Sequence, residues 1–269
     1  MVKHRHHDAE MTSAPDPAPP SMGVVKSAGR ALQLLEFFED IRRPARAVEA
    51  AAALGMPQSS SSMLLRSLRE LGYLDYDPAT RTYLPSPRVA LLGSWLDAGP
   101  VRDGRVTRLL EHLNESYVKT TFLAARNSIF AQYIYMMPAR STMRFHVATG
   151  ARRLLVGSAA GMALLTDAPD DEISRLHRRT AAEFPDFRLT LDQVMENVAA
   201  MRAQGHFLSR ALVTEGAAAL AIRLPRGIDK AGRPIALAMA GLLDEFERRE
   251  AEFADVMKDA AARFLDDRY

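Results

Sequence analysis

Short polar side chains and one arginine follow Pro57, and these residue types suit contacts with DNA rather than catalysis. Glutamine, serine and arginine hydrogen-bond to base edges and phosphates in a major groove about 12 Å wide. Gln58 could hold an adenine through two hydrogen bonds, and Arg66 could hold a guanine or a phosphate. The candidate DNA-contacting residues of this segment are Gln58, Ser59, Ser60, Ser62, Met63 and Arg66.

An apolar stripe within the same segment predicts a helix over residues 57–71. Four residues recur at i, i+3, i+4 and i+7, which places them on one helical face and turns the polar residues outward. They are Ser61, Leu64, Leu65 and Leu68. The alternative is a low-complexity serine linker, but a linker does not continue into a regular apolar stripe.

The elements on either side of this helix predict a winged helix-turn-helix unit. A first amphipathic helix ends near Asp40, and an alanine-rich helix over residues 46–54 is stopped by Gly55. Residues 73–84 contain two short aromatic strand runs around an Asp-Pro-Ala-Thr turn, which predicts a β-hairpin wing. The helix that carries the polar residues would then be the recognition helix.

Two further arginines are candidates for contacts with DNA. Arg81 lies at the predicted wing tip and Arg46 near the start of the second helix, and each could equally be a solvated surface charge. Between residues 42 and 88 seven arginines face four carboxylates, although the net charge of the whole chain is only +2. The basic excess is therefore local, as a small phosphate-contacting module requires.

A linker helix and a larger α+β unit follow the predicted wing. Ser86 and Pro87 suit the cap and first turn of a helix over residues 88–97, which would carry Leu91, Leu92 and Trp95. The pattern of the remaining chain predicts an antiparallel sheet flanked by helices. It contains a helix through residues 106–113, several strand-like runs and a charged helix over residues 245–265. The predicted strands are 120–125, 130–136, 143–148, 217–223 and 235–241.

Capping residues define one more helix of this unit. Thr190 and Gln193 form a capping box, and Gly205 ends the helix that they open. The predicted organisation of the chain is a disordered tail (1–22), a winged helix-turn-helix domain (23–85), a linker helix (86–100) and a second domain (101–269).

Length and composition exclude several classes of protein. With 269 residues, 48% of them hydrophobic and 25% charged, the chain fits two globular domains. The absence of cysteine excludes disulfides, thiolate zinc sites and iron–sulfur clusters, and no apolar run is long enough to span a membrane. We expect a cytoplasmic protein with no cofactor, no functional metal and no membrane partner.

Three stretches of the N-terminal part form a specific pattern. They are Lys26-Ser-Ala-Gly-Arg-Ala-Leu-Gln-Leu-Leu35; Leu54-Gly-Met-Pro-Gln-Ser-Ser-Ser-Ser62 with Leu64-Leu-Arg-Ser-Leu68; and Gly72-Tyr73 with Asp77-Pro78 and Tyr83. In this order and spacing they resemble the IclR family of transcription regulators, and weaker similarity continues into the second domain. The resemblance implies a GAF-like effector-binding domain, double-stranded operator DNA as a partner, and a homodimer or tetramer.

The resemblance also implies a site for a small-molecule effector, typically a small carboxylate. The anion would lie at a helix N-terminus, where unpaired backbone N–H groups and the helix dipole favour negative charge. Gly157, Ser158 and Ala159 stand at the corresponding position, although this segment could also be a plain helix cap.

Two tyrosines and one arginine could complete the effector site. Tyr133 and Tyr135 are two positions apart in a predicted strand, so we expect them on one strand face, where they either line the cavity or belong to the core. Arg144 could pair with the carboxylate or be a solvated surface charge.

The chain departs from the family pattern in one direction, because polar residues give way to small or apolar ones. Val156 stands where a histidine is common, and Ser209 stands at a commonly acidic position. Ala219 replaces a usual cysteine, and Ala238 and Ala240 stand where serines are common. Because these changes make the pocket larger and drier, we expect an effector with a hydrophobic or aromatic body.

Two other functions compete with this interpretation. An enzyme could assemble a hydrolytic site from its histidines, but the chain has no nucleophile elbow, no zinc-binding histidine pair and no glycine-rich phosphate loop. A DNA-binding regulator whose second domain only oligomerises also agrees with the polar-to-apolar changes. The histidines concerned are His112, His146, His177 and His206.

Overall fold

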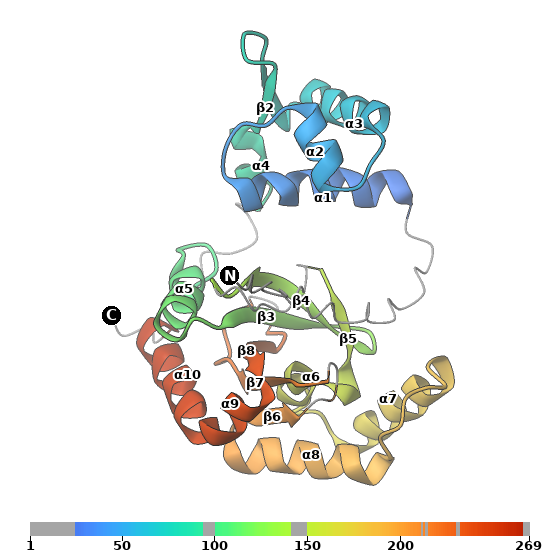
Figure 1. Cartoon of the computed structure of the whole chain (residues 1–269). Coiled ribbons are helices and arrows are strands. Elements are labelled where there is room, and N and C mark those ends of the chain that lie inside the picture. The colour runs from blue at the N-terminus through green and yellow to red at the C-terminus, as the bar shows by residue number, and fades with distance from the viewer. Residues whose placement is uncertain are drawn as a thin grey trace, which may run out of the picture. The chain divides into compact units, whose positions relative to one another are not determined.

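The computed structural model describes residues 25–93, 100–140, 150–210, 212, 215–229 and 232–265, which form two compact units that are treated separately below. The predicted α+β class is confirmed, because helices accompany an antiparallel sheet (Figure 1). Several predictions fall outside the described residues: the tail 1–22, the strand 143–148 with Arg144 and His146, and Trp95.

The N-terminal unit contains the predicted helices and hairpin. Three helices precede a two-stranded antiparallel hairpin, and a short fourth helix follows it (Figure 1). The elements are α1 (Lys26–Ile41), α2 (Ala47–Ala53), α3 (Gln58–Glu70), β1 (Leu74–Asp77), β2 (Thr82–Pro85) and α4 (Pro87–Leu92). The winged helix-turn-helix arrangement predicted from the sequence is thereby confirmed.

The inner face of α3 holds this unit together. Leu65 and Leu68 are buried with residues of α1 and the hairpin, and Leu64 packs against the same core. Ser61 is fully buried and its hydroxyl donates a hydrogen bond of 3.3 Å to the carbonyl of Ala47, so a polar contact joins α3 to α2. The apolar stripe predicted for this helix is confirmed.

The cap of the linker helix is as predicted, but the described helix is shorter. The hydroxyl of Ser86 accepts the N–H of Arg88 at 3.3 Å and donates to the carbonyl of Gly72 at 2.6 Å. Helix α4 ends at Leu92, whereas the predicted helix continued to Asp97; residues 94–99 lie outside the described part. Leu91 and Leu92 are exposed in this unit.

A six-stranded antiparallel sheet forms the centre of the C-terminal unit. Its strand order is β5-β4-β3-β8-β7-β6. The strands are β3 (Thr120–Asn127), β4 (Phe130–Met137), β5 (Arg152–Leu154), β6 (Phe207–Arg210), β7 (Ala217–Arg223) and β8 (Ile235–Leu242). The helices are α5 (Arg105–Tyr117), the 3-10 turn η1 (Leu155–Gly157), α6 (Ala159–Leu164), α7 (Asp170–Glu183), α8 (Leu191–Gln204), α9 (Leu243–Arg248) and α10 (Glu250–Leu265).

On β7 and β8 the two faces of this sheet carry side chains of different size. Large residues such as Leu220, Leu237 and Met239 pack with α5, α9 and α10. The other face belongs to the core formed with α6, α7 and α8 (Figure 1). On β7 and β8 this second face presents Ala219, Ala221, Ala236, Ala238 and Ala240, which we call the alanine face.

Helix α6 lies against the alanine face and leaves no room for a side chain at Gly161. The helix contacts both β7 and β8, and every residue in it is buried. A Cβ atom added at Gly161 would lie 1.7 Å from the carbonyl oxygen of Leu155, which is backbone and cannot rotate away. The glycine is therefore required by close approach of two backbone segments, not by its own φ angle.

The structure corrects the predicted strand and helix boundaries in three places. Strands β5 and β6 were not predicted, because runs of three and four residues carry too little pattern where no turn signal joins two of them, as it does between β1 and β2. The single helix expected over residues 245–265 is two helices, with a break at Arg249 where φ is −118°. In contrast, the capping box of Thr190 and Gln193 is present as predicted, and Gly205 ends α8.

The prediction that Tyr133 and Tyr135 share a strand face is wrong. The pairing of β3 with β4 shifts between Leu123, opposite Tyr135, and Ala124, opposite Tyr133, so Ile134 is an extra, unpaired residue. A β-bulge of this kind interrupts the alternation of side chains. Tyr133 consequently belongs to the core on the alanine side, and Tyr135 packs against the core on the opposite side.

Replacing Gly161 by alanine should destabilise the C-terminal unit by about 1–3 kcal/mol, since the added methyl group forces α6 away from Leu155. Urea unfolding followed by circular dichroism measures the loss. Gly93→Ala is the matched control, because an added Cβ there meets nothing within 4 Å and φ is −91°. The control should change stability by less than about 0.5 kcal/mol. An unchanged urea midpoint for Gly161→Ala would contradict the argument.

Candidate functional site

The outward side of α3 presents the predicted DNA-contacting residues together. Gln58, Ser59 and Arg66 are exposed, and Met63 retains 62% of its accessible surface. Ser60 and Ser62 are half-buried at the edge of this surface. The helix thus offers a row of hydrogen-bonding groups around one apolar side chain, which is a composition able to contact base edges.

The two arginines of α3 differ in their surroundings. Arg69 forms an ion pair with Glu70, and its guanidinium lies 5.9 Å from the centre of the Tyr76 ring. Arg66 donates from Nε to the carbonyl of Ser62 at 3.3 Å, and the described residues give it no carboxylate partner. Arg66 is therefore the arginine of this helix whose charge is available to an outside anion.

A similar difference separates the arginines at the start of α2. Glu49 accepts the backbone N–H of Arg46 at 3.0 Å and pairs with the guanidinium of Arg43 at 2.8 Å. These contacts, the backbone hydrogen bond first, hold the pKa of Glu49 below its ordinary value. Among the described residues the guanidinium of Arg46 forms no ion pair, although its charge also favours the ionised form of Glu49, so it remains available beside the N-terminus of α2.

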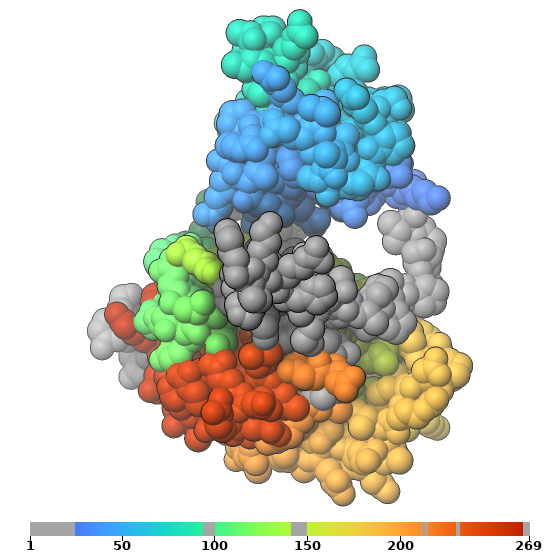
Figure 2. Space-filling model, viewed as in Figure 1, coloured from blue at the N-terminus to red at the C-terminus, as the bar shows by residue number. Residues whose placement is uncertain are grey.

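The wing consists of β1, β2 and the turn between them. Asp77 is paired with Thr82, and Arg81 lies in the turn with an exposed side chain. The backbone of Ala45 exchanges hydrogen bonds of 2.8 and 3.1 Å with that of Tyr83, which attaches the hairpin to the segment before α2. The turn therefore projects from a well-anchored base (Figure 2).

Five of the predicted effector residues lie on the alanine side of the C-terminal sheet. Ser209 is opposite Ala219, and Ala219 is opposite Ala240, so these three form a row across β6, β7 and β8. Ala238 lies one row further along the same face and is fully buried. Tyr133 belongs to the same core, where its ring stacks on that of Phe122 with centroids 4.2 Å apart.

The predicted anion-binding segment forms the junction between η1 and α6. The hydroxyl of Ser158 accepts the N–H of Gly161 at 3.2 Å, which is the geometry of a helix cap. A Cβ atom at Gly157 would lie 3.2 Å from the ring of Phe187, so this position also approaches its neighbour closely. Arg144, which could complete the site, lies outside the described residues.

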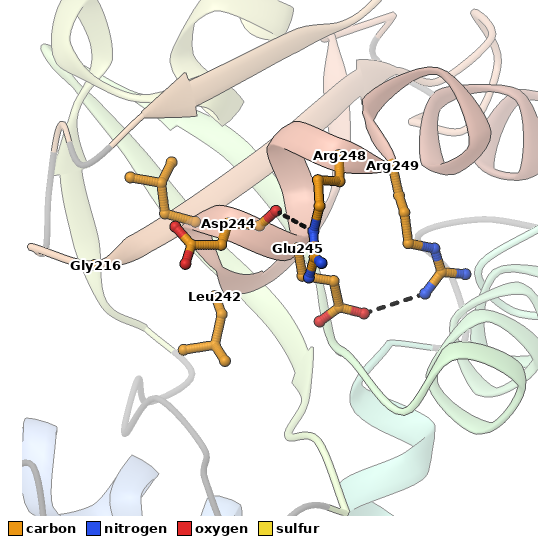
Figure 3. A pocket seen from close by; sticks show the side chains of 7 residues that line it. Gly216, Leu242, Asp244, Glu245, Arg248 and Arg249 are labelled. Atoms are coloured by element: carbon orange, nitrogen blue, oxygen red, sulfur yellow. Dashed lines mark hydrogen bonds and ion pairs between the residues drawn. The ribbon is translucent and has the colours of Figure 1, made fainter.

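A pocket of about 670 Å³ lies elsewhere, where β8 runs into α9 (Figure 3). Within it Glu245 is bound by Lys119 at 2.7 Å and by Arg249 at 3.1 Å, while Arg248 donates to the carbonyl of Asp244. None of the predicted effector residues lines this pocket, and no motif in the sequence pointed to it. It is lined by Gly216, Leu242, Leu243, Asp244, Glu245, Arg248 and Arg249.

The described histidines belong to separate elements and do not form a catalytic cluster. His112 lies beside Phe264, His177 is 2.9 Å from the carbonyl of Leu189, and His206 is 3.5 Å from Glu250. The described residues contain no group of three histidine, aspartate or glutamate side chains that could bind a metal. None of the helices in the described ranges is long and apolar enough to cross a membrane.

Family models match both units of the chain. The model of the IclR helix-turn-helix domain matches residues 27–78, and the model of the C-terminal domain of the bacterial transcriptional regulator IclR matches residues 103–264. Comparison with curated protein sequences gives no match.

Solved structures of IclR regulators share the fold. IclR from Thermotoga maritima is 18% identical with a TM-score of 0.59 over 89% of this chain and 97% of that one. A regulator from Alicyclobacillus acidocaldarius is 21% identical with a TM-score of 0.57 over 90% and 98%. The effector domain of an IclR regulator from Acinetobacter sp. ADP1 is 22% identical with a TM-score of 0.53 over 60% and 94%.

These relatives are transcription regulators rather than enzymes. Since the two family models together span most of the chain and match its two units in order, the chain belongs to the IclR family of DNA-binding transcription regulators.

Proposed function

We propose that α3 reads the operator in the major groove through Gln58, Ser59, Met63 and Arg66, with Ser60 and Ser62 at the edge of the contact. The observation that carries this proposal is the difference between Arg66 and Arg69, since only Arg69 already has a carboxylate partner. Arg46 supports α3 by contacting a phosphate beside α2. A symmetric homodimer, alone or paired into a tetramer, presents two such helices to the half-sites of a palindromic operator.

We further propose that the C-terminal unit binds a small carboxylate with a hydrophobic or aromatic body, and that this effector changes operator binding. The row formed by Ser209, Ala219 and Ala240 supports the proposal, because Ala219 and Ala240 are only partly buried although they lie on a core face. The fold shared with the Acinetobacter protein, which is described as an effector domain, agrees with this role.

The chemistry of the alanine face determines the class of effector. Methyl groups offer an apolar surface without hydrogen-bonding groups, which favours a hydrophobic body over a small diacid. The carboxylate would lie at the Gly157–Ala159 segment and meet the N–H groups at the start of α6 that Ser158 does not cap. The effector would act by binding one of two regulator conformations more tightly than the other.

The alternative is a C-terminal unit that only oligomerises. The complete burial of Ala238 favours it, because α6 already occupies part of the alanine face. Under this alternative no carboxylate would bind.

Arg66→Ala should weaken operator binding by about 1–3 kcal/mol and relax the base preference at one position of each half-site. The measurement is a mobility-shift titration on an operator duplex selected from a random-sequence library. Arg69→Ala is the matched control, since it removes the same charge from the same helix but from an arginine already paired with Glu70. Equal losses for both variants would mean that Arg66 contributes only general charge.

Ala240→Leu should abolish the effector response and leave operator binding intact, because the larger side chain fills the space beside Ala219. A thermal-shift screen of aromatic monocarboxylates, with small diacids for comparison, identifies the ligand; at about 100 times its Kd it stabilises the protein by about 2.7 kcal/mol. Met239→Leu is the control, because it replaces one large apolar side chain by another of similar volume on the opposite face.

Three results would contradict the effector proposal. A full thermal shift retained by Ala240→Leu would place the ligand elsewhere. A preference for diacids would overturn the hydrophobic class. The absence of any shift in the wild-type protein would support the oligomerisation alternative.

A further inference from the structure

Arg81 holds an unfavourable backbone conformation at the tip of the wing. Its φ angle is +58°, in the left-handed region where the Cβ of a residue other than glycine crowds the carbonyl oxygen that follows it. The turn needs this conformation to close the hairpin, because Asp77 and Thr82 are already paired on either side of it. Glycine would meet the requirement without strain, so the side chain at this position needs another explanation.

Side-chain hydrogen bonds hold the turn together, and none of them involves the guanidinium of Arg81. Asp77 accepts the N–H of Ala79 at 2.8 Å and the hydroxyl of Thr80 at 2.7 Å, and Thr80 also contacts the hydroxyl of Thr82 at 2.7 Å. These contacts, that of the Thr80 hydroxyl first, hold the pKa of Asp77 below its ordinary value. In the described part of the chain Arg81 has no hydrogen bond, ion pair or ring contact.

The other described residues that have left-handed backbones and are not glycine lie at helix ends or in a turn. Arg42 and Val118 are the C-caps of α1 and α5. Ser128 occupies the β3–β4 turn, where its carbonyl and hydroxyl accept hydrogen bonds from Arg126 and Arg179. Arg81, in contrast, stands in the exposed turn at the tip of the wing and not at the end of a helix, so its long charged side chain is presented to a partner outside the unit.

We propose that Arg81 enters the minor groove beside the half-site that α3 reads, and that it makes the operator prefer A·T base pairs at that flank. The inference rests on the proposed docking of α3 in the major groove. A narrow minor groove of A·T-rich DNA concentrates negative potential and attracts an inserted arginine. Arg81 thereby adds sequence preference at positions that the recognition helix does not touch.

The shape and charge of the tip favour groove insertion over a contact with one phosphate. Pro78, Ala79 and Thr80 are short, so Arg81 is the long side chain of the turn, and a groove about 6 Å wide admits one extended side chain. The hairpin projects from the rest of its unit (Figures 1 and 2). The negative charge of Asp77 offsets the positive charge of Arg81, so Arg81 adds little to the nonspecific electrostatic attraction between the wing and the phosphates.

The test compares three operator duplexes that share one core and differ only in the flank facing the wing: A·T, G·C, and inosine·cytosine. Inosine lacks the 2-amino group that guanine places in the minor groove, while its major-groove edge matches that of guanine. The full-length wild-type protein should bind the A·T and inosine flanks about tenfold more tightly than the G·C flank.

Arg81→Gly should reduce this flank preference to less than about twofold, because it removes the side chain that enters the minor groove. Because glycine accepts the left-handed backbone, this variant should melt no lower than the wild type. Arg42→Gly is the matched control, since Arg42 is also an exposed arginine with a left-handed backbone (φ +48°) in the same unit. The control should keep the wild-type flank preference.

Two results would overturn the inference. Arg81→Gly could retain the flank preference, or it could lose affinity equally on all three flanks, which would indicate a phosphate contact. Failure of the recognition-helix proposal can be distinguished from failure of this inference. Arg66→Ala should change the base preference within the shared core of the duplexes whatever the flank, whereas Arg81→Gly should change the base preference at the flank alone.

Discussion

The close approach of α6 to the sheet is the constraint on which the C-terminal unit depends. Gly161 lets the backbone of α6 lie against the carbonyl of Leu155, and the alanine face lets the same helix lie close to β7 and β8. Protein interiors are packed too densely to absorb a misplaced methyl group at such a contact. The small residues proposed to admit an effector are therefore the ones that also let α6 approach the sheet. The proposed effector binding and the stability of the fold thus depend on the same part of the sheet.

In the N-terminal unit, ion pairing separates arginines that serve the fold from arginines available to DNA. Arg43 and Arg69 are tied to Glu49 and Glu70 and stay beside their own helices. Neither Arg66 nor Arg46 forms an ion pair with a carboxylate among the described residues. The hydrogen bond of Ser61 to Ala47 holds the helix that carries Arg66 in position. Rigid support beneath unpaired donors is what a binding surface needs, because little freedom is then lost on binding.

How much of the structure the sequence could predict depends on how many residues carry each signal. Helix α3 and strands β7 and β8 have regular patterns, and α8 has a complete capping box, so these were found. Strands β5 and β6 are too short for a pattern. The bulge at Ile134 depends on how β4 pairs with β3, which the sequence of β4 alone does not show, and it turns Tyr135 to the face opposite to the predicted one. The pocket at α9 combines a distant glycine with ion pairs, which no local pattern encodes.

The difference in side-chain size between the two faces of β7 and β8 also affects which strand pairing forms during folding. Along β8, and along β7 from Ala219 to Ile222, alanine alternates with a larger apolar residue. A slip of one residue in strand pairing would turn every side chain to the other face. Leu220 and Leu237 would then crowd α6, which now packs against alanines, and alanines would leave voids beneath α10. Misaligned pairings are thus penalised on both faces at once, and the alternation that shapes the proposed effector site also protects the sheet from misfolding.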